Sequence, residues 1–169
     1  MFLTDVINFH RRHGIQGGST FEHVIKNLTE DEIKYRLGFL FEELIETTKA
    51  FGVNVDSGAE LALKNLIANA TIDYKNYDEL EIIDGLLDLV YVSFGTLDLM
   101  ELSEGQIREH QAEIQRANMS KERSSGADDS RSKRKHSLDI VKPKGWKGPN
   151  HGAIMESRVK RFLETANEK

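Results

Sequence analysis

The hydrophobic residues of the first 120 positions recur every three or four residues, which is the spacing of one face of an α-helix. The clearest stripe consists of Ile33, Leu37, Leu40, Leu44 and Thr48. The sequence Thr-Glu-Asp-Glu at residues 29–32 spells a capping box before this stripe, and Gly52 offers a left-handed cap after it. We therefore expect an amphipathic helix over about residues 30–51.

Similar signals predict the other helices of an all-α chain. Ser57, Asp78 and Ser103 each stand three residues before a Glu or Gln, as the first residue of a capping box does. The expected helices lie around Leu3–Arg12 and over about residues 57–66, 78–100, 103–120 and 152–169. Residues 121–151 lack apolar periodicity and contain both prolines, so they are interpreted as a loop. The predicted fold is a four-to-five-helix bundle of residues 1–120, a loop of residues 121–151 and a short C-terminal helix of residues 152–169.

The segment 79–100 combines apolar residues on nearly every side with one line of carboxylates. A helix that is hydrophobic all round is expected to be buried. Glu81, Asp84 and Asp88 are three and four residues apart, so they fall within about 60° of one another on this helix. Burying three carboxylates is costly unless a cation compensates their charge, and a divalent metal ion is the simplest such cation.

A second group of carboxylates, Glu42, Glu43 and Glu46, lies beside the apolar stripe of the segment 30–51. If the two helices pack antiparallel, their acidic edges can face each other across a shared cleft. Carboxylate oxygens select Mg²⁺ or Mn²⁺ over zinc. Taken singly, each motif has a plainer interpretation, because Glu-Glu-x-x-Glu is common on solvated helices and Glu81 also suits a helix cap.

Composition narrows the possible chemistry. The chain has no cysteine, which excludes disulfides, thiolate metal sites and a cysteine nucleophile. None of the six histidines stands three residues after a Glu, so the Glu-x-x-His pattern of di-iron bundles is missing. No apolar run reaches the roughly 18 residues of a membrane span, and the N-terminus has no signal-peptide pattern, so we expect a cytoplasmic protein without a membrane partner.

Charge is distributed unevenly along the chain. The net charge is −5, yet residues 121–147 hold nine Lys or Arg against four Asp or Glu, a net +5. Residues 148–169 add +1, which leaves −11 for residues 1–120. The run Arg131-Ser132-Lys133-Arg134-Lys135 could serve as an electrostatic patch for nucleic acid. The acidic body and the lack of interleaved aromatic residues favour a solvated loop instead.

At its acidic motifs the sequence resembles the all-α nucleoside triphosphate pyrophosphohydrolases, which include MazG-like proteins, dimeric dUTPases and phosphoribosyl-ATP pyrophosphohydrolase. The shared signature is Glu-Glu-x-x-Glu followed by Glu-x-x-Asp, matched here by residues 42–46 and 81–84. Residues 84–96, the sequence Arg-Ala-Asn-Met-Ser-Lys at 116–121 and Lys-Gly-Pro-Asn at 147–150 are similar to the phosphoribosyl-ATP pyrophosphohydrolase-like subgroup. The basic stretch 122–140 departs from that pattern.

The resemblance implies a catalytic helical bundle that hydrolyses a (d)NTP to the monophosphate and pyrophosphate with Mg²⁺, or Mn²⁺ in its place. The implied metal ligands are Glu43, Glu46, Glu81 and Asp84. Glu42 and Asp88 are implied as further ligands or as the base that orients the attacking water, and Glu46 is counted among the catalytic residues. For phosphate binding we expect some of Arg116, Lys121, Lys144 and Lys147 to contribute. Asn118 is a candidate for a base or ribose contact, and Trp146 for packing or for stacking on a base.

Three alternatives stay open at this point. The first is phosphoribosyl-ATP pyrophosphohydrolase itself, an enzyme of histidine biosynthesis, whose chains are usually shorter and lack the Lys-Gly-Pro-Asn tail. The second is a nucleic-acid binder without enzymatic activity. The third is a helical interaction module with an incidental acidic stripe. In each case the apolar helix and the C-terminal helix favour a homodimer or homotetramer, and the preferred base is not indicated.

Overall fold

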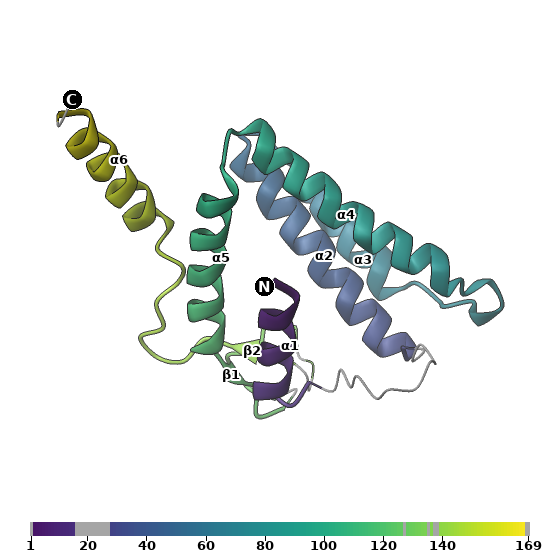
Figure 1. The fold of residues 1–169 in the computed structure, drawn as a ribbon. Coiled ribbons are helices and arrows are strands. Elements are labelled where there is room, and N and C mark those ends of the chain that lie inside the picture. Colours follow the sequence, from purple (N-terminus) through teal and green to yellow (C-terminus); the bar gives the residue numbers. More distant parts are fainter. Residues whose placement is uncertain (1, 16–27, 127, 135, 137–138, 168–169) are drawn as a thin grey trace. The chain divides into compact units, whose positions relative to one another are not determined.

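The structure, a computed structural model of the whole chain, describes residues 2–15, 28–126, 128–134, 136 and 139–167 (Figure 1). The predicted all-α class is confirmed, because helices make up most of the described residues. The elements are α1 (Phe2–Arg12), α2 (Glu30–Ala50), α3 (Ser57–Ala68), the 3-10 turn η1 (Tyr74–Asn76), α4 (Glu79–Leu99), α5 (Glu104–Met119), β1 (Glu122–Arg123), β2 (Ile140–Val141) and α6 (His151–Asn167). Within these described elements, no helix combines the length and the apolar character needed to cross a membrane.

The chain divides into two compact units. One comprises Glu22–Gly85, and the other comprises Met1–Phe21 together with Leu86–Lys169. The boundary falls within α4, so the first part of that helix belongs to the unit Glu22–Gly85 and the rest to the other unit.

The ends of α2 follow the capping chemistry expected from the sequence. The Thr29 hydroxyl accepts a hydrogen bond from the Glu32 amide at 3.2 Å, and the Glu32 carboxylate accepts one from the Thr29 amide at 2.9 Å. At the other end Gly52 has φ of +79°, the left-handed conformation that costs glycine little. Both caps are therefore confirmed, and they fix the helix that carries the first acidic motif.

The helix α3 packs against α2, with one difference from the expected cap. The Asp56 carboxylate, not Ser57, caps the first turn by accepting a hydrogen bond from the Ala59 amide at 3.1 Å. Glu60 takes no part in a capping box. Its two carboxylate oxygens instead accept hydrogen bonds from Lys49 of α2 at 2.6 Å and from Lys64 at 2.8 Å. These bonds lower the pKa of Glu60 to about 2, the Lys49 contact having the largest effect.

The most buried position of α2 lies beside the predicted stripe, not within it. Ile45 is the buried residue of this helix, whereas Leu40 is 40% exposed and Leu44 is 57% exposed. The reason is that α3 contacts the side of α2 that carries Lys49, and Ile45 lies on that same side, one turn earlier. Within a single chain, Leu40 and Leu44 of the predicted stripe are therefore exposed, while Ile33, Leu37 and Thr48 are half-buried.

In the other unit, α5 is the central helix, packing against both α1 and α6. Ser103 and Gln106 form the predicted capping box at its start. Near its end the Gln115 side chain donates a hydrogen bond to the Asp5 carbonyl of α1 at 3.0 Å. Ala117 is fully buried and Val141 nearly so, which makes the end of α5 the core of this unit.

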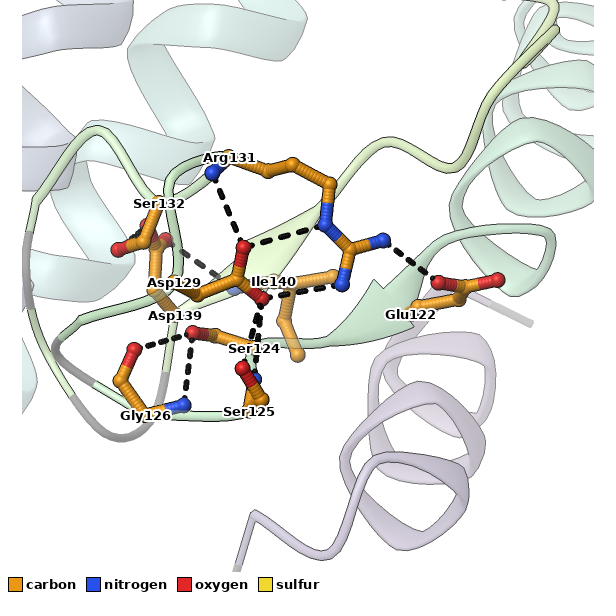
Figure 2. Close-up of polar contacts among 9 residues, drawn as sticks. All are labelled: Glu122, Ser124, Ser125, Gly126, Asp129, Arg131, Ser132, Asp139 and Ile140. Carbon is orange, nitrogen blue, oxygen red and sulfur yellow. Dashed lines mark hydrogen bonds and ion pairs between the residues drawn. The ribbon is translucent and has the colours of Figure 1, made fainter.

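The segment between α5 and α6, expected to be a loop, contains a short antiparallel ladder in which Glu122 pairs with Val141 and Arg123 with Ile140. Two buried carboxylates organise the chain between these strands (Figure 2). Asp129 accepts hydrogen bonds from Arg131 and from Ser125. Asp139, only 1% exposed, accepts hydrogen bonds from Ser132 at 2.8 Å and from Arg134 at 3.2 Å. The described part of this loop is therefore held by hydrogen bonds and ion pairs to two buried carboxylates.

The prediction that α4 is buried is wrong for the single chain. Its apolar side chains are exposed on every side, with Leu80 at 75%, Leu87 at 63% and Val92 at 65%. The sequence pattern was interpreted correctly as that of a helix that is apolar on every side except for one line of carboxylates.

Candidate functional site

The first acidic motif lies in the second half of α2. Glu42, Glu43 and Glu46 are all within the continuous helix, so the spacing of three and four residues places Glu46 within a turn of each of the other two. Glu43 and Glu46 are exposed and Glu42 is half-buried. The three carboxylates can therefore reach solvent or a ligand from one region of the helix surface.

Glu42 lies near a cation of the neighbouring helix α3. The pKa of Lys64 on α3 is raised, first by its hydrogen bond to Glu60 and further by the charge of Glu42. Lys64 thus offsets part of the negative charge of the motif.

The second acidic motif occupies the start of α4. Asp78 caps this helix, its carboxylate accepting hydrogen bonds from the Leu80 amide at 3.0 Å and the Glu81 amide at 3.1 Å. Glu81 and Asp84 follow within the unit Glu22–Gly85, and Asp88 lies one turn further on, in the part of α4 that belongs to the other unit. All three carboxylates are exposed. The helical spacing that brings them onto one face is therefore present.

The described residues include no group of three or more acidic or histidine side chains arranged to hold a metal ion. The two motifs supply hard oxygen donors of the type that Mg²⁺ prefers, so the donor set fits the metal chemically. The convergence of Glu43, Glu46, Glu81 and Asp84 on one point stays a prediction.

Comparison of the chain with models of known protein families, with curated proteins and with solved structures finds no match. The candidate site therefore has to be argued from its own residues.

The predicted phosphate-binding residue Arg116 is engaged within the fold. Its guanidinium donates two hydrogen bonds to the Glu113 carboxylate, both at 2.8 Å, and a third to the Gly148 carbonyl at 3.0 Å. The Asn150 amide donates to the same carboxylate at 2.8 Å, and together these contacts, Arg116 first, lower the pKa of Glu113 to about 2. Arg116 thus ties the Lys-Gly-Pro-Asn turn to α5.

Trp146 packs against the end of α5, and the ammonium groups of two lysines lie over its ring. Its indole nitrogen donates a hydrogen bond to the Ala117 carbonyl at 2.9 Å. The ammonium of Lys142 lies 4.6 Å from the ring centroid and that of Lys121 lies 5.4 Å from it, within the range of cation–π contacts. Trp146 therefore has a packing role in this structure. Lys121, a predicted substrate residue, and Lys142, which was not predicted, both lie over its ring. The sequence feature that could have indicated Lys142 is the alternation of lysines before the tryptophan in Lys142-Pro-Lys144-Gly-Trp146.

The remaining predicted substrate residues lie in the same unit as Lys121. Asn118 is half-buried in the last turn of α5, while Lys144 and Lys147 are exposed on either side of Trp146. Four predicted substrate residues thus lie in or near the turn that Arg116 ties to α5, namely Asn118, Lys121, Lys144 and Lys147.

The basic run that suggested nucleic-acid binding is largely paired within the described residues. Arg131 binds Asp129 at 3.0 Å and Glu122 at 2.9 Å, and Arg134 binds Asp139 at 3.2 Å. Lys135 lies outside the described residues. An arginine that is already paired with a buried carboxylate is less available to bind the phosphates of a nucleic acid. These ion pairs therefore favour a structural role for the basic run.

Proposed function

We propose that the protein is a Mg²⁺-dependent nucleoside triphosphate pyrophosphohydrolase that converts a (d)NTP to the monophosphate and pyrophosphate, with Mn²⁺ as an alternative metal. The proposal is carried by one observation: both acidic motifs lie in uninterrupted helices, so that each presents its carboxylates at helical spacing. Two such carboxylate groups in an all-α chain are a donor set suited to a hard divalent cation.

Each residue has a defined part in this proposal. Glu43, Glu46, Glu81 and Asp84 would hold the metal, which when bound neutralises the triphosphate and activates water. Glu42, Glu46 and Asp88 are the carboxylates available to orient the attacking water or accept its proton. The lysines at positions 121, 144 and 147 provide positive charge for the phosphates, and Asn118 provides a donor and an acceptor for the base or ribose. Arg116 supports this segment through its contacts with Glu113 and Gly148.

Turnover with a panel of nucleotides tests the proposal directly. The full-length protein is incubated with each NTP and dNTP, and with phosphoribosyl-ATP, in the presence of Mg²⁺, and the products are separated. Monophosphate and pyrophosphate are expected in equal amounts. Release of orthophosphate would reject the proposed bond, and hydrolysis confined to phosphoribosyl-ATP would favour the histidine-biosynthesis enzyme.

Two substitutions link turnover to the acidic motifs. Glu46→Gln and Asp84→Asn each keep the size of the side chain but remove a charged ligand, so the rate should fall about 100-fold or more. Glu156→Gln on α6 is the matched control, since it removes an exposed carboxylate outside both motifs. Equal loss in all three variants would argue against the assignment.

We further propose that a second copy of the chain covers α4. Soluble monomers rarely expose an apolar patch larger than a few hundred Å², and the apolar residues of this helix are exposed on every side. A two-fold axis lets the same helix face its own copy, which buries apolar surface on both chains at once. A homodimer, or a homotetramer built from it, would cover the apolar surface of α4 in this way.

A further inference from the structure

The segment between β2 and α6 carries three lysines and no acidic residue. Lys142, Lys144 and Lys147 lie within six residues of one another, and the sequence from Ile140 to Met155 contains no Asp or Glu. All three side chains are exposed. Within the part of the chain that the structure describes, none of the three ammonium groups forms an ion pair. Their positive charge is therefore not compensated by a carboxylate of the fold.

The arginines of the same unit behave differently. Arg116 and Arg158 bind carboxylates of α5 at 2.8 Å and 2.9 Å. Arg131 and Arg134 bind the buried carboxylates of the loop at 3.0 Å and 3.2 Å. These four cations stabilise the fold through their partners. The three lysines contribute no ion pair to it, so their charge is available to another molecule.

Trp146 lies in the middle of this lysine segment and is firmly placed. Its indole N–H donates to the Ala117 carbonyl, and a Cβ at Gly148 would lie 3.5 Å from the ring, so the glycine backbone lies against it. The Lys142 ammonium lies 4.6 Å from the ring centroid. This cation–π contact orients the ammonium, but the ring has no net charge and leaves the charge of the lysine uncompensated.

A tight turn holds the three lysines close together along the chain. The Trp146 amide donates a hydrogen bond to the carbonyl three residues earlier at 3.0 Å, which closes a turn over residues 143–146. Gly145, at the third position of this turn, has φ of +76°, a conformation that glycine adopts readily. The two ends of such a turn lie within about 7 Å of each other. Lys142 and Lys147 flank these ends, and the third lysine lies within the turn.

The chemistry of the segment favours an anion with several charges. Lysine binds phosphate as a point charge, and a chain of two or more phosphate groups offers oxygens to more than one ammonium. Nucleic acid fits less well, because proteins that bind single strands stack bases on exposed aromatic rings. Here the ammonium groups of lysines already lie over the Trp146 ring.

We propose that Lys142, Lys144 and Lys147 form a binding site for a chain of two or more phosphate groups, with the Lys142 ammonium held over the Trp146 ring before the ligand arrives. The inference rests on the proposed function, since it places the phosphates of the nucleotide, or of the pyrophosphate product, at this turn. It adds Lys142 as a phosphate contact. Binding requires neither a divalent metal nor hydrolysis, so it can be tested separately from turnover.

The fluorescence of Trp146 provides the test, because it is the only tryptophan of the chain. The full-length protein is titrated with inorganic pyrophosphate in EDTA at constant ionic strength. The emission should change and then saturate, since a bound anion alters the charge beside the indole ring. No saturable change would overturn the proposal. An equal response to poly-glutamate would also overturn it, because the site would then not distinguish phosphate from other anions.

Variants separate the phosphate contact from general charge. Lys142→Gln should bind pyrophosphate about tenfold more weakly, because one charge-assisted contact is lost. Lys142→Arg keeps a cation that stacks on aromatic rings, and its affinity should stay within about threefold. Lys133→Gln, an exposed lysine of the same loop outside the turn, is the matched control and should bind normally.

Two outcomes of this series contradict the site. One is unchanged affinity in Lys142→Gln, and the other is an equal loss of affinity in Lys133→Gln. If Lys142→Gln does not fold, Lys144→Gln provides the same readout. Titration with each of the four dNTPs in EDTA identifies the source of the phosphates. Tighter binding of a dNTP than of pyrophosphate supports a substrate site, and the reverse order supports a product site.

The combined results distinguish the two proposals. Pyrophosphate binding that depends on Lys142, without turnover of any nucleotide, would refute only the proposed function. Turnover with kcat and KM unchanged in Lys142→Gln, and with no saturable binding of pyrophosphate, would refute only the lysine site.

Discussion

The indole nitrogen of Trp146 donates a 2.9 Å hydrogen bond to the carbonyl oxygen of Ala117, a residue with no exposed surface. The same carbonyl, in the last turn of α5, also accepts hydrogen bonds from the Ser120 amide at 3.3 Å and from the Ser120 hydroxyl at 2.7 Å, so the bond mainly satisfies the indole donor. Trp146→Phe keeps most of the packing but removes the donor, so unfolding in urea should show a loss of about 1 kcal/mol. The matched substitution Lys147→Ala, at an exposed position, should change stability by less than about 0.5 kcal/mol.

The sequence predicted the helices of this protein well because their signals are local. The capping boxes at Thr29 and Ser103, the Asp78 cap and the left-handed Gly52 each depend on residues within one turn. The single wrong cap, Asp56 in place of Ser57, differs by one position. Two adjacent residues with short oxygen-bearing side chains are both good caps, so sequence alone does not separate them.

The packing could not be predicted to the same extent, because it depends on which helix faces which. The stripe ending at Leu44 and Thr48 was the more periodic face of α2, yet Ile45 is the residue that α3 helps to bury. The same distinction between local signals and tertiary packing applies to the candidate site. The spacing within each acidic motif follows from helix geometry, whereas the meeting of the two motifs requires tertiary contacts that no local signal specifies.

A second prediction concerns the buried carboxylate of Asp139. Burial raises its pKa, but hydrogen bonds from Ser132 and Arg134 outweigh burial and leave the pKa below its ordinary value of 3.8. A carboxyl with a lowered pKa in the folded state stabilises the protein above its unfolded-state pKa. That contribution should be fully present at neutral pH and should be lost as the pH falls below about 4.

Asp139→Asn tests this contribution. At pH 7 the free energy of unfolding should fall by about 1.5–3 kcal/mol, because hydrogen bonds to a buried charge are lost. The decline of stability between pH 5 and pH 3 should also be shallower than in the unmodified protein. Asp128→Asn, at an exposed position in the same loop, is the control. Identical pH profiles for Asp139→Asn and the unmodified protein would contradict the prediction.

The junction between α5 and α6 should respond to mild acid. His110 and His151 lie with their Nδ1 atoms 2.9 Å apart, a hydrogen bond that requires one of the two nitrogens to be unprotonated. Burial lowers the pKa of His110, and the charges of His151 and Arg158 lower it further, against a raising effect of Glu109. Because the folded-state pKa lies below the unfolded value of 6.5, the contribution to stability is complete above pH 6.5 and is lost as the pH falls through the folded-state pKa.

Hydrogen exchange of the α6 amides at pH 7.5 and pH 5.5, corrected for the intrinsic exchange rate, measures this response. Protection should decrease at pH 5.5, because burial and the neighbouring cationic groups disfavour the protonated form of His110 in the folded state. In His110→Gln the change with pH should be reduced, because one titrating partner is gone. The contact of Arg158 with Glu109 at 2.9 Å remains in that variant and should keep α6 partly protected.

The last prediction concerns the surface of α4. Leu87 is 63% exposed in the single chain, in a helix whose apolar residues are uncovered on every side. If a second copy covers this helix, Leu87→Glu would place a charge in the interface, and desolvating that charge costs several kcal/mol. Light scattering with size-exclusion chromatography should therefore give a dimeric or tetrameric mass for the unmodified protein and a lower mass for the variant.

A matched substitution on another helix tests whether the oligomer depends on α4 in particular. Leu163 on α6 is 54% exposed, close to the exposure of Leu87, so Leu163→Glu makes the same chemical change on a different helix. The mass should be unchanged in that variant. A monomeric mass for the unmodified protein would contradict the proposal of a second copy, and loss of the oligomer only in Leu163→Glu would move the interface to α6. Since the acidic residues Glu81 and Asp84 share α4 with Leu87, turnover by the variant would also reveal whether assembly supports the proposed metal site.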